Sequence, residues 1–302
     1  MSPKELKPIY SRDPDTPYPF VFIGLKKYTA QGLVIHEGGY DGTVRWAGAA
    51  LNSRKLVIDL TRPPVGVPVD RVAVSPPAGA EIPFMLVEGL NHATILKRPQ
   101  ELIEPVLDAL NVDSGDAYKA WTEAYSGASE TPRWQQFVVR VVDERGDPVP
   151  DYYIAMGTGK GTSFKPLDHF SMDVHTYGGD PSFRCFHVNL DAIDAVRGKD
   201  LQLRLLASSG TPWVSYYGYA GVGEAMIRTD GVHDGDAGAD DSSQPVIWNA
   251  RLDLDLPDEI GFSLFYEYTT TLIEIRLNRE PNPPFDPNDP GARMHLIHFA
   301  DR

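Results

Sequence analysis

The most informative stretch of this sequence is Phe84-Met85-Leu86-Val87-Glu88-Gly89-Leu90-Asn91-His92-Ala93-Thr94-Ile95, an apolar run that ends at a single histidine. A short apolar run that is closed by Gly and Asn predicts a buried strand. Open parallel sheets bind their ligands beyond the carboxyl ends of their strands. The sequence therefore places His92 where a catalytic base would lie.

A second apolar run, Phe20-Val21-Phe22-Ile23-Gly24-Leu25, predicts another buried strand, and the loop that follows it carries Asp41. An acid after one strand and a histidine after a later strand is the chain order of the last two members of a Ser, Asp, His triad. We therefore predict that His92 is a general base and that Asp41 orients its imidazole. The alternative that stays open is that each residue only caps a helix.

Length and composition predict a globular protein that is large enough for two ordinary domains. The chain has 302 residues, of which 42% are hydrophobic. Its 42 acidic residues outnumber its 28 basic residues, which gives a formal net charge of −14. This charge argues against binding to nucleic acid or to an anionic membrane, so small substrates or protein partners are the expected ligands.

The sequence also bears on the cellular compartment. The single cysteine, Cys185, excludes an internal disulfide and fits a reducing environment. The first residues contain no apolar signal region, and no run approaches the roughly eighteen apolar residues that a membrane-spanning helix needs. We expect a cytoplasmic protein without a transmembrane segment as the chain stands, whereas an export signal on a preceding part stays open.

Residues 1–125 are predicted to form a partial α/β domain. A short helix should begin at residues 41–43, with Val44, Ala47 and Leu51 on its apolar face. Residues 54–60 and 70–74 predict two strands of a hairpin that is inserted between the acid and the histidine.

Two helices are expected after His92. The first covers residues 99–110 and carries an apolar stripe, and the second covers residues 117–125. The stripe consists of Leu102, Ile103, Val106, Leu107 and Leu110. The order of strand, histidine and helix is typical of an α/β arrangement.

Residues 126–133 are small and polar and end near a proline, so they predict a linker. Beyond them, residues 134–302 predict an all-β sandwich of the immunoglobulin or C2-like kind. Residues 136–142 and 149–156 should pair as neighbouring strands across the turn 143–148. Further strands are expected at 182–190, 201–207, 213–219, 246–254 and 269–277, with one short helix near 191–196.

Two loops resemble those of a known family. Asp41-Gly42-Thr43-Val44-Arg45 and Gly89-Leu90-Asn91-His92-Ala93-Thr94 resemble the acid loop and the histidine loop of α/β-hydrolase lipases and esterases. Residues 141–150 and 269–281 resemble the C-terminal β domain of some bacterial members. The resemblance covers nearly the whole chain but only the C-terminal half of such enzymes. It implies hydrolysis of a carboxylic ester or phospholipid, without a cofactor, by a triad that contains Asp41 and His92.

The nucleophile of such an enzyme is missing, because the sequence contains no Gly-x-Ser-x-Gly motif. Triad members act as a unit, so Asp41 and His92 alone should retain a trace of activity at most. We expect a serine-bearing partner chain, a longer polypeptide, or self-association through a sheet edge exposed before residues 20–25. The alternative function is a non-catalytic module whose β-sandwich recognises a protein, a lipid or a glycan.

An acidic loop at residues 230–241 offers weak candidates for calcium ligands, namely Asp230, Asp234, Asp236 and Asp241. Val232 stands where an EF-hand has a ligand, Asp241 replaces the bidentate Glu, and no helices flank the loop. We therefore predict a disordered acidic loop and no metal site.

Overall fold

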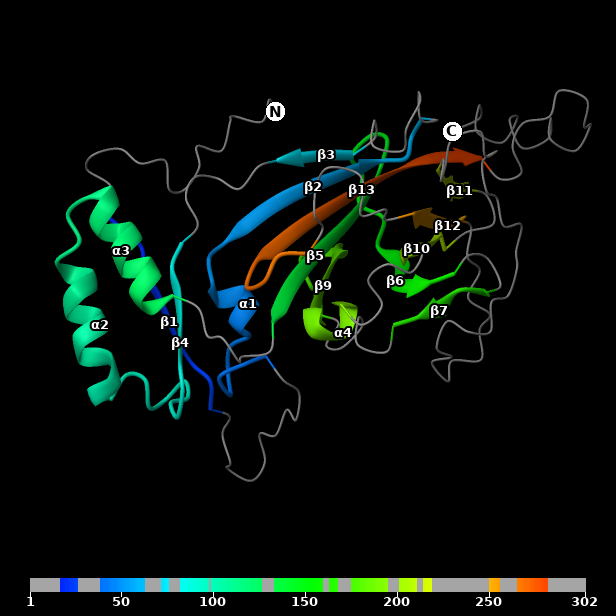
Figure 1. Ribbon diagram of the computed structural model, residues 1–302. Helices are drawn as coiled ribbons and strands as arrows, with labels where there is room; N and C mark the ends of the chain where they lie inside the picture. The colour runs from blue at the N-terminus through cyan, green and yellow to red at the C-terminus, as the bar shows by residue number, and fades with distance from the viewer. Residues whose placement is uncertain are drawn as a thin grey trace, which may run out of the picture.

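The computed structural model of this chain has a mixed α/β fold, with three sheets and four short helices over the residues that it describes (Figure 1). A small parallel sheet with helices around it lies beside two larger sheets. The described residues are 17–26, 39–62, 72–75, 82–97, 99–126, 133–159, 163–167, 175–194, 201–210, 214–218, 250–255 and 265–281.

The small sheet consists of β1 (Val21–Gly24) and β4 (Phe84–Val87), the two buried strands that the sequence predicts. They run parallel, with Val21 opposite Phe84 and Gly24 opposite Val87. Because the carboxyl ends of parallel strands meet at one edge of a sheet, the residues directly after both strands lie together, and the Lys26 N–H donates to the Leu90 carbonyl at 2.7 Å.

Both faces of the small sheet are covered. Successive side chains of a strand point to opposite faces, so each strand contributes to two separate cores. One core adjoins α1 (Trp46–Ala49) and includes the buried residues Ile23, Phe84, Leu86, Trp46 and Trp134. The other adjoins α2 (Gln100–Leu110) and includes Val87, Leu90 and Leu102, with Phe22 and Met85 packed against it. Helix α3 (Gly115–Tyr125) closes this second face, because the ring of its Trp121 packs on Phe20 and Phe22.

Two helices differ from their predictions in detail. Helix α1 begins at Trp46, because the Asp41 carboxylate closes a tight turn on residues 43 and 44 and does not cap the helix. Leu51, which was expected on its apolar face, is exposed and has a positive φ of 61°. Helix α2 buries Leu102 and Pro105, whereas Ile103, Leu107 and Leu110 of the predicted stripe are 44%, 54% and 77% exposed. The reason is that α3 and the small sheet cover only one side of α2.

The largest sheet is organised around its long strand β13 (Thr270–Pro281). This strand runs parallel to both of its main neighbours, β2 (Ser53–Asp59) and β5 (Trp134–Asp143). The predicted hairpin between acid and histidine is β2 with β3 (Val72–Ser75), and it extends this sheet. The remaining strands are β9 (Asp180–Asn189), β8 (His175–Tyr177) and β11 (Val214–Tyr217).

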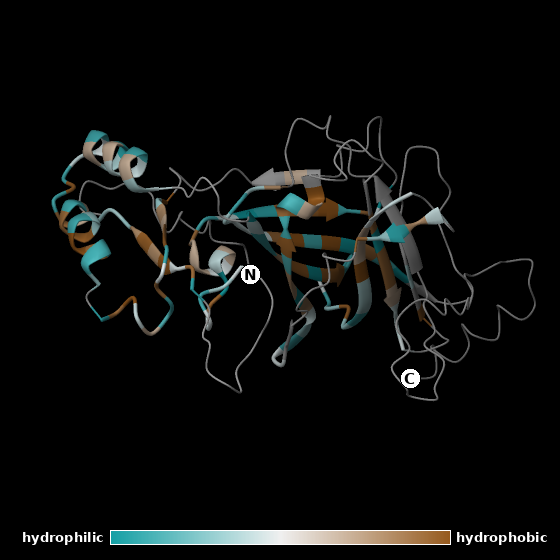
Figure 2. Ribbon diagram, turned by 60° about the horizontal axis from the view of Figure 1, so that its bottom comes forward, coloured by the Kyte–Doolittle hydropathy of each residue, from teal (hydrophilic) through white to brown (hydrophobic). Residues whose placement is uncertain are grey.

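The third sheet has the order β12 (Ala250–Asp255), β10 (Leu201–Ser208), β6 (Asp151–Thr158) and β7 (Lys165–Pro166). It shares one apolar core with the largest sheet, because a single cluster joins buried residues of β2, β5, β6, β9, β10 and β13. In Figure 2 hydrophobic and hydrophilic segments alternate along the strands, as half-buried strands require. The short helix α4 (Leu190–Asp194) follows β9.

The prediction that residues 149–156 pair with the preceding strand is wrong. A single bridge joins Val142 and Pro148 after the turn, and β6 then pairs with β10 in the other sheet. The physical reason is that both edges of β5 are already occupied, by β13 and β9. The parallel pairs of β13 also differ from the purely antiparallel sheets of an immunoglobulin-like sandwich.

The division at residues 126–133 stays a prediction, since residues 127–132 lie outside the described part of the chain. The structure adds one fact that bears on it. Strand β2, which precedes the predicted linker, pairs along seven residues with β13, which follows it. The two parts of the sequence therefore share a sheet.

Candidate active site

Asp41 and His92 lie in direct contact at the carboxyl edge of the small sheet. The Nδ1 atom of His92 is 3.0 Å from Oδ2 of Asp41. The two loops are also joined through the backbone, because the His92 N–H donates to the Asp41 carbonyl at 3.1 Å. An acid on Nδ1 holds the imidazole in one orientation and leaves Nε2 for chemistry. The structure thus brings together the two residues that the sequence predicts as catalytic, and their role remains a proposal.

The carboxylate of Asp41 is buried and fully engaged. Its Oδ1 accepts the N–H groups of Thr43 at 2.9 Å and Val44 at 2.7 Å, while Oδ2 faces His92. Its side chain is only 5% exposed. Such bonds to an ionised carboxylate are strong, and they satisfy a charge that would otherwise be costly to bury.

The turn that holds Asp41 depends on two glycines. Gly39 and Gly42 have φ values of 86° and 100°, which side chains rarely adopt. Gly39 also lies against the ring of Trp134, where a Cβ atom would approach within 2.6 Å. Position 39 therefore requires glycine twice, once for its backbone angle and once for its contact with the core.

The loop that carries His92 is fixed by its neighbours. The Asn91 Oδ1 accepts the N–H groups of Ala93 and Thr94, and the Thr94 Oγ1 accepts the Asn91 N–H at 2.8 Å. The loop also lies against the end of β1, because a Cβ on Gly24 would lie 2.4 Å from the Leu90 carbonyl oxygen. The positioning roles of Asn91, Thr94 and Gly24 were not predicted from the sequence. The signals for them were an Asn and a Thr close to His92 and a Gly at the end of a strand.

The two partners differ in their access to solvent. The side chain of His92 is 45% exposed, in contrast to the buried Asp41. Within the described part of the chain, the imidazole hydrogen-bonds to Asp41 alone. Its Nε2 is thus accessible to an incoming hydroxyl group, and the arrangement can accept a proton there while the carboxylate stabilises the imidazolium.

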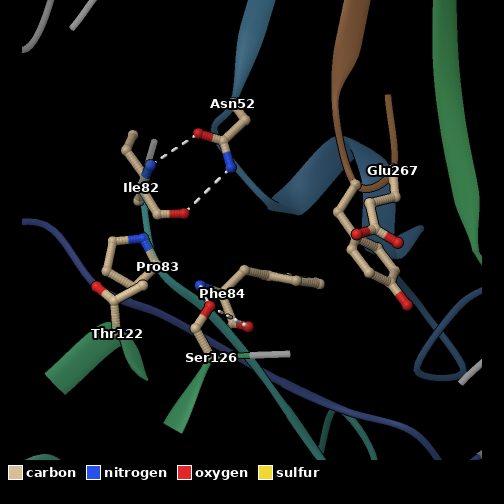
Figure 3. Close-up of a pocket in the computed structure, with 8 residues that line it drawn as sticks. Asn52, Ile82, Pro83, Phe84, Thr122, Ser126 and Glu267 are labelled. Carbon is tan, nitrogen blue, oxygen red and sulfur yellow. Dashed lines mark hydrogen bonds between the residues drawn. The ribbon is translucent and has the colours of Figure 1, made fainter. Parts of the chain in front are cut away.

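A pocket of ≈ 220 Å³ lies at the other end of the small sheet. Figure 3 shows its lining, in which Asn52 bonds twice to the backbone of Ile82 and Ser126 bonds to the backbone of Phe84. Phe84 begins β4, whereas His92 follows its end, so this pocket is separate from the candidate site.

Three of the polar side chains that line that pocket are neutral or already hydrogen-bonded to the backbone. Burial, with a further contribution from the charges of Glu267 and Asp191, raises the pKa of Tyr268 to about 12, so its phenol stays neutral. The side chains of Asn52 and Ser126 are used by the backbone. Tyr268, Asn52 and Ser126 are therefore not activated for catalysis.

The metal candidates Asp230, Asp234, Asp236 and Asp241 lie outside the described residues. In the part of the chain that the structure does describe, no three His, Cys, Asp or Glu side chains gather as metal ligands.

Among the helices described, none has the length and apolar character to cross a membrane.

Comparisons with known proteins give a likeness in fold. No family model and no curated sequence matches this chain. Among solved structures, the phospholipase PlaB from Legionella pneumophila superposes with a TM-score of 0.58 at 17% identity, covering 90% of this chain and 59% of that chain. The same phospholipase in complex with thio-NAD gives 0.57 at 16% identity and covers 90% and 61%. This chain thus has a PlaB-like fold and spans about three fifths of the length of those chains.

Proposed function

We propose that this chain supplies the acid and the base of a serine-type hydrolase that cleaves carboxylic esters of lipids. The observation that carries the proposal is the contact of 3.0 Å between a buried carboxylate and Nδ1 of a half-exposed histidine. The likeness in fold to a phospholipase supports a lipid ester as the substrate class. The serine belongs to a polypeptide segment outside the described residues, either on a partner chain or on the same polypeptide.

The chemistry follows from the positions of the two side chains. His92 would accept the serine proton at Nε2 while the serine oxygen attacks the ester carbonyl, and Asp41 would remain ionised and stabilise the imidazolium. The histidine would then return the proton to the departing alcohol, which leaves an acyl-serine. Water would repeat the sequence and release the acid.

The test uses a fluorophosphonate probe, which reacts with activated serines, on the tagged chain as recovered from its source. We expect a labelled serine in the recovered assembly and a loss of labelling of at least about 10³-fold in His92→Ala. Lys97→Ala is the matched control, because Lys97 is an exposed residue of the same loop.

Two results would count against the proposal. Labelling that is unchanged in His92→Ala would show that His92 is not the base. No labelled serine in any preparation, combined with saturable binding of a protein, lipid or glycan, would favour the non-catalytic binding module instead.

A further inference from the structure

We propose that the pocket at the start of β4 is a binding site for a small quaternary ammonium group, such as that of choline. The inference is independent of the proposed function, because this pocket lies at the opposite end of the small sheet from His92. It is carried by an uncompensated carboxylate, a pair of aromatic rings and a strained backbone in the pocket wall.

The pocket forms where separate parts of the fold meet. Phe84 begins β4, Ser126 follows α3, and Tyr268 precedes β13. Clefts between packed units of a fold are preferred places for small ligands. The volume of ≈ 220 Å³ lies below the roughly 300–1,000 Å³ of pockets that hold drug-sized ligands. The expected ligand is therefore a group of few heavy atoms.

The pocket carries a negative charge that no neighbour balances. The charges that act on Tyr268 are those of Glu267, Asp191 and Arg133. Arg133 and Asp191 pair with each other at 2.8 Å. Among the described residues, the carboxylate of Glu267 forms no ion pair and no hydrogen bond, and only its backbone carbonyl accepts a bond, from the Thr269 hydroxyl. The charge of Glu267 thus favours a cation as the ligand.

The hydroxyl groups of the wall point to the same conclusion. Ser126 donates its proton to the Phe84 carbonyl at 3.3 Å, and Thr122 donates its proton to the Tyr118 carbonyl at 2.8 Å. Neither hydroxyl therefore has a proton for an anion or for a carbonyl oxygen of a ligand. An anion would also meet the charge of Glu267.

Two aromatic rings form the apolar part of the wall. The ring centroids of Phe84 and Tyr268 are 5.0 Å apart, and their planes are inclined by 41°. In Figure 3 the side chain of Phe84 extends toward the side of the pocket that Glu267 occupies. The face of an aromatic ring attracts a cation within about 6 Å of its centroid, and quaternary ammonium ligands are bound in this way. Rings beside a carboxylate thus match an alkylated cation.

The backbone at Tyr268 is strained, because its φ of 48° is rare for a bulky residue. Its N–H donates to the Trp134 carbonyl at 2.7 Å, which helps to hold this conformation. Neighbouring side chains of a regular strand point to opposite faces, whereas Glu267 and Tyr268 both line the pocket. Strained residues cluster at ligand sites. The strain here brings a carboxylate and an aromatic ring to one wall.

Two other kinds of cation fit this wall poorly. A calcium ion takes about six to eight oxygen ligands, but among the residues described around the pocket Glu267 alone contributes a carboxylate. A primary ammonium has N–H groups that need acceptors, whereas the Asn52 and Ser126 side-chain oxygens already accept backbone N–H groups. A quaternary ammonium has no N–H group, so the negative charge and the rings are sufficient for it.

The first experiment is isothermal titration calorimetry of the purified chain with choline. The comparison ligands are dimethylbutanol, in which carbon replaces the quaternary nitrogen, and methylammonium, which keeps the charge and gains N–H groups. We expect choline to bind at least about tenfold more tightly than either. Equal affinity for dimethylbutanol would overturn the role of charge, and equal affinity for methylammonium would overturn the quaternary assignment. Absence of choline binding by the folded chain would overturn the inference.

The second experiment compares variants of the wall. Glu267→Gln should weaken choline binding at least about tenfold, because it removes the charge and keeps the shape. Glu88→Gln is the matched control, since Glu88 is an exposed acid in the turn after β4 and its loss changes the net charge equally. Tyr268→Phe should retain binding and Tyr268→Leu should lose it, since leucine has no aromatic face. Urea denaturation checks that each variant is folded. Unchanged affinity in Glu267→Gln would overturn the site.

The third experiment separates two sources of the ammonium group. Cosedimentation with phosphatidylcholine vesicles, competed by free choline and weakened in Glu267→Gln, would identify the group as a lipid head group. Choline binding without such cosedimentation would identify it as a free small cation. Either outcome supports the site, because both depend on Glu267.

Discussion

At the residue scale, the candidate site is a pair of side chains with opposite environments. Asp41 is buried and accepts two backbone N–H groups, while His92 projects its ring toward solvent. The carboxylate is positioned before any partner binds, because its own turn supplies the two N–H groups. A site prepared in this way loses little freedom when a serine arrives.

The Asp41→Asn variant tests the orientation of the imidazole in the chain by itself. The Asn Oδ1 can still accept the N–H groups of Thr43 and Val44, but its amide then donates to Nδ1 of His92. The ring proton should therefore move from Nδ1 to Nε2, which removes the lone pair that a serine would need. The measurement is the ¹⁵N spectrum of labelled protein at a pH where the ring is neutral, assigned with His92→Ala. An unchanged tautomer would show that Asp41 does not set it.

Gly24→Ala tests the close contact between β1 and the histidine loop. A Cβ at this position would lie 2.4 Å from the Leu90 carbonyl oxygen and 2.9 Å from the Asn91 backbone nitrogen, so the loop must move. We expect the free energy of unfolding to fall by about 1–3 kcal/mol, as measured by urea denaturation. Gly178→Ala is the control, because a Cβ there meets no atom within 4 Å. Equal stability of the two variants would contradict the contact.

At the element scale, β13 holds the largest sheet together. It pairs in parallel with β2 on one side and with β5 on the other, and its residues Ile273, Ile275 and Leu277 are buried in the main core. These partners come from distant parts of the sequence. Damage to β13 should therefore weaken both neighbouring strands at once.

The same substitution at two isoleucines separates buried from exposed positions. Ile275→Val, in the middle of β13 and fully buried, should lower the free energy of unfolding by about 0.5–1.5 kcal/mol. Ile103→Val, on the exposed side of α2, should change it by less than about 0.5 kcal/mol. Urea denaturation measures both, and a larger loss at Ile103 would mean that this side of α2 is covered in solution.

At the scale of the whole molecule, the acidic chain keeps a carboxylate inside its largest sheet. Glu274 of β13 bonds to Lys55 of β2 at 3.1 Å and to Arg276 at 2.7 Å. Burial alone would raise the pKa of Glu274, but the bonds to Arg276 and Lys55 outweigh it and hold the pKa below its usual value of 4.5. The stability of the fold at low pH therefore depends in part on the ionised Glu274 carboxylate, which links β13 to β2.

Glu274→Gln tests this dependence on pH. Because the folded carboxyl has the lower pKa, its contribution is complete above the unfolded pKa of about 4.5 and is lost as the pH falls through the folded value. We expect the free energy of unfolding of Glu274→Gln to be about 1–3 kcal/mol lower than that of the unmodified chain at neutral pH. The difference in urea midpoint between the two proteins should shrink between about pH 5 and pH 3. A difference that does not change with pH would contradict the assignment.

The sequence by itself determined most of the local elements and the two candidate residues, Asp41 and His92. Apolar runs with clear boundaries identified β1 and β4, and alternation identified the longer strands after residue 134, because these signals depend on neighbours within one element. The short strands β7 and β8 were not predicted. The placement of Asp41 and His92 after parallel strands followed from the same local pattern. The start of α1 and the buried side of α2 could not be predicted from the sequence. The turn at Asp41 decides where α1 starts, and the packing partners of α2 decide which of its sides is buried.

Only the tertiary structure decided which strands pair. Nothing near residues 53–59 indicates that this strand lies beside residues 270–276, and nothing near residues 151–158 indicates that it leaves the sheet of β5. Strand pairing over such separations depends on which edges remain open and on which faces share a core, and these are properties of the assembled chain. The contact of Asp41 with His92 belongs to the same class, because Gly24 and the turn at Gly39 bring their loops together.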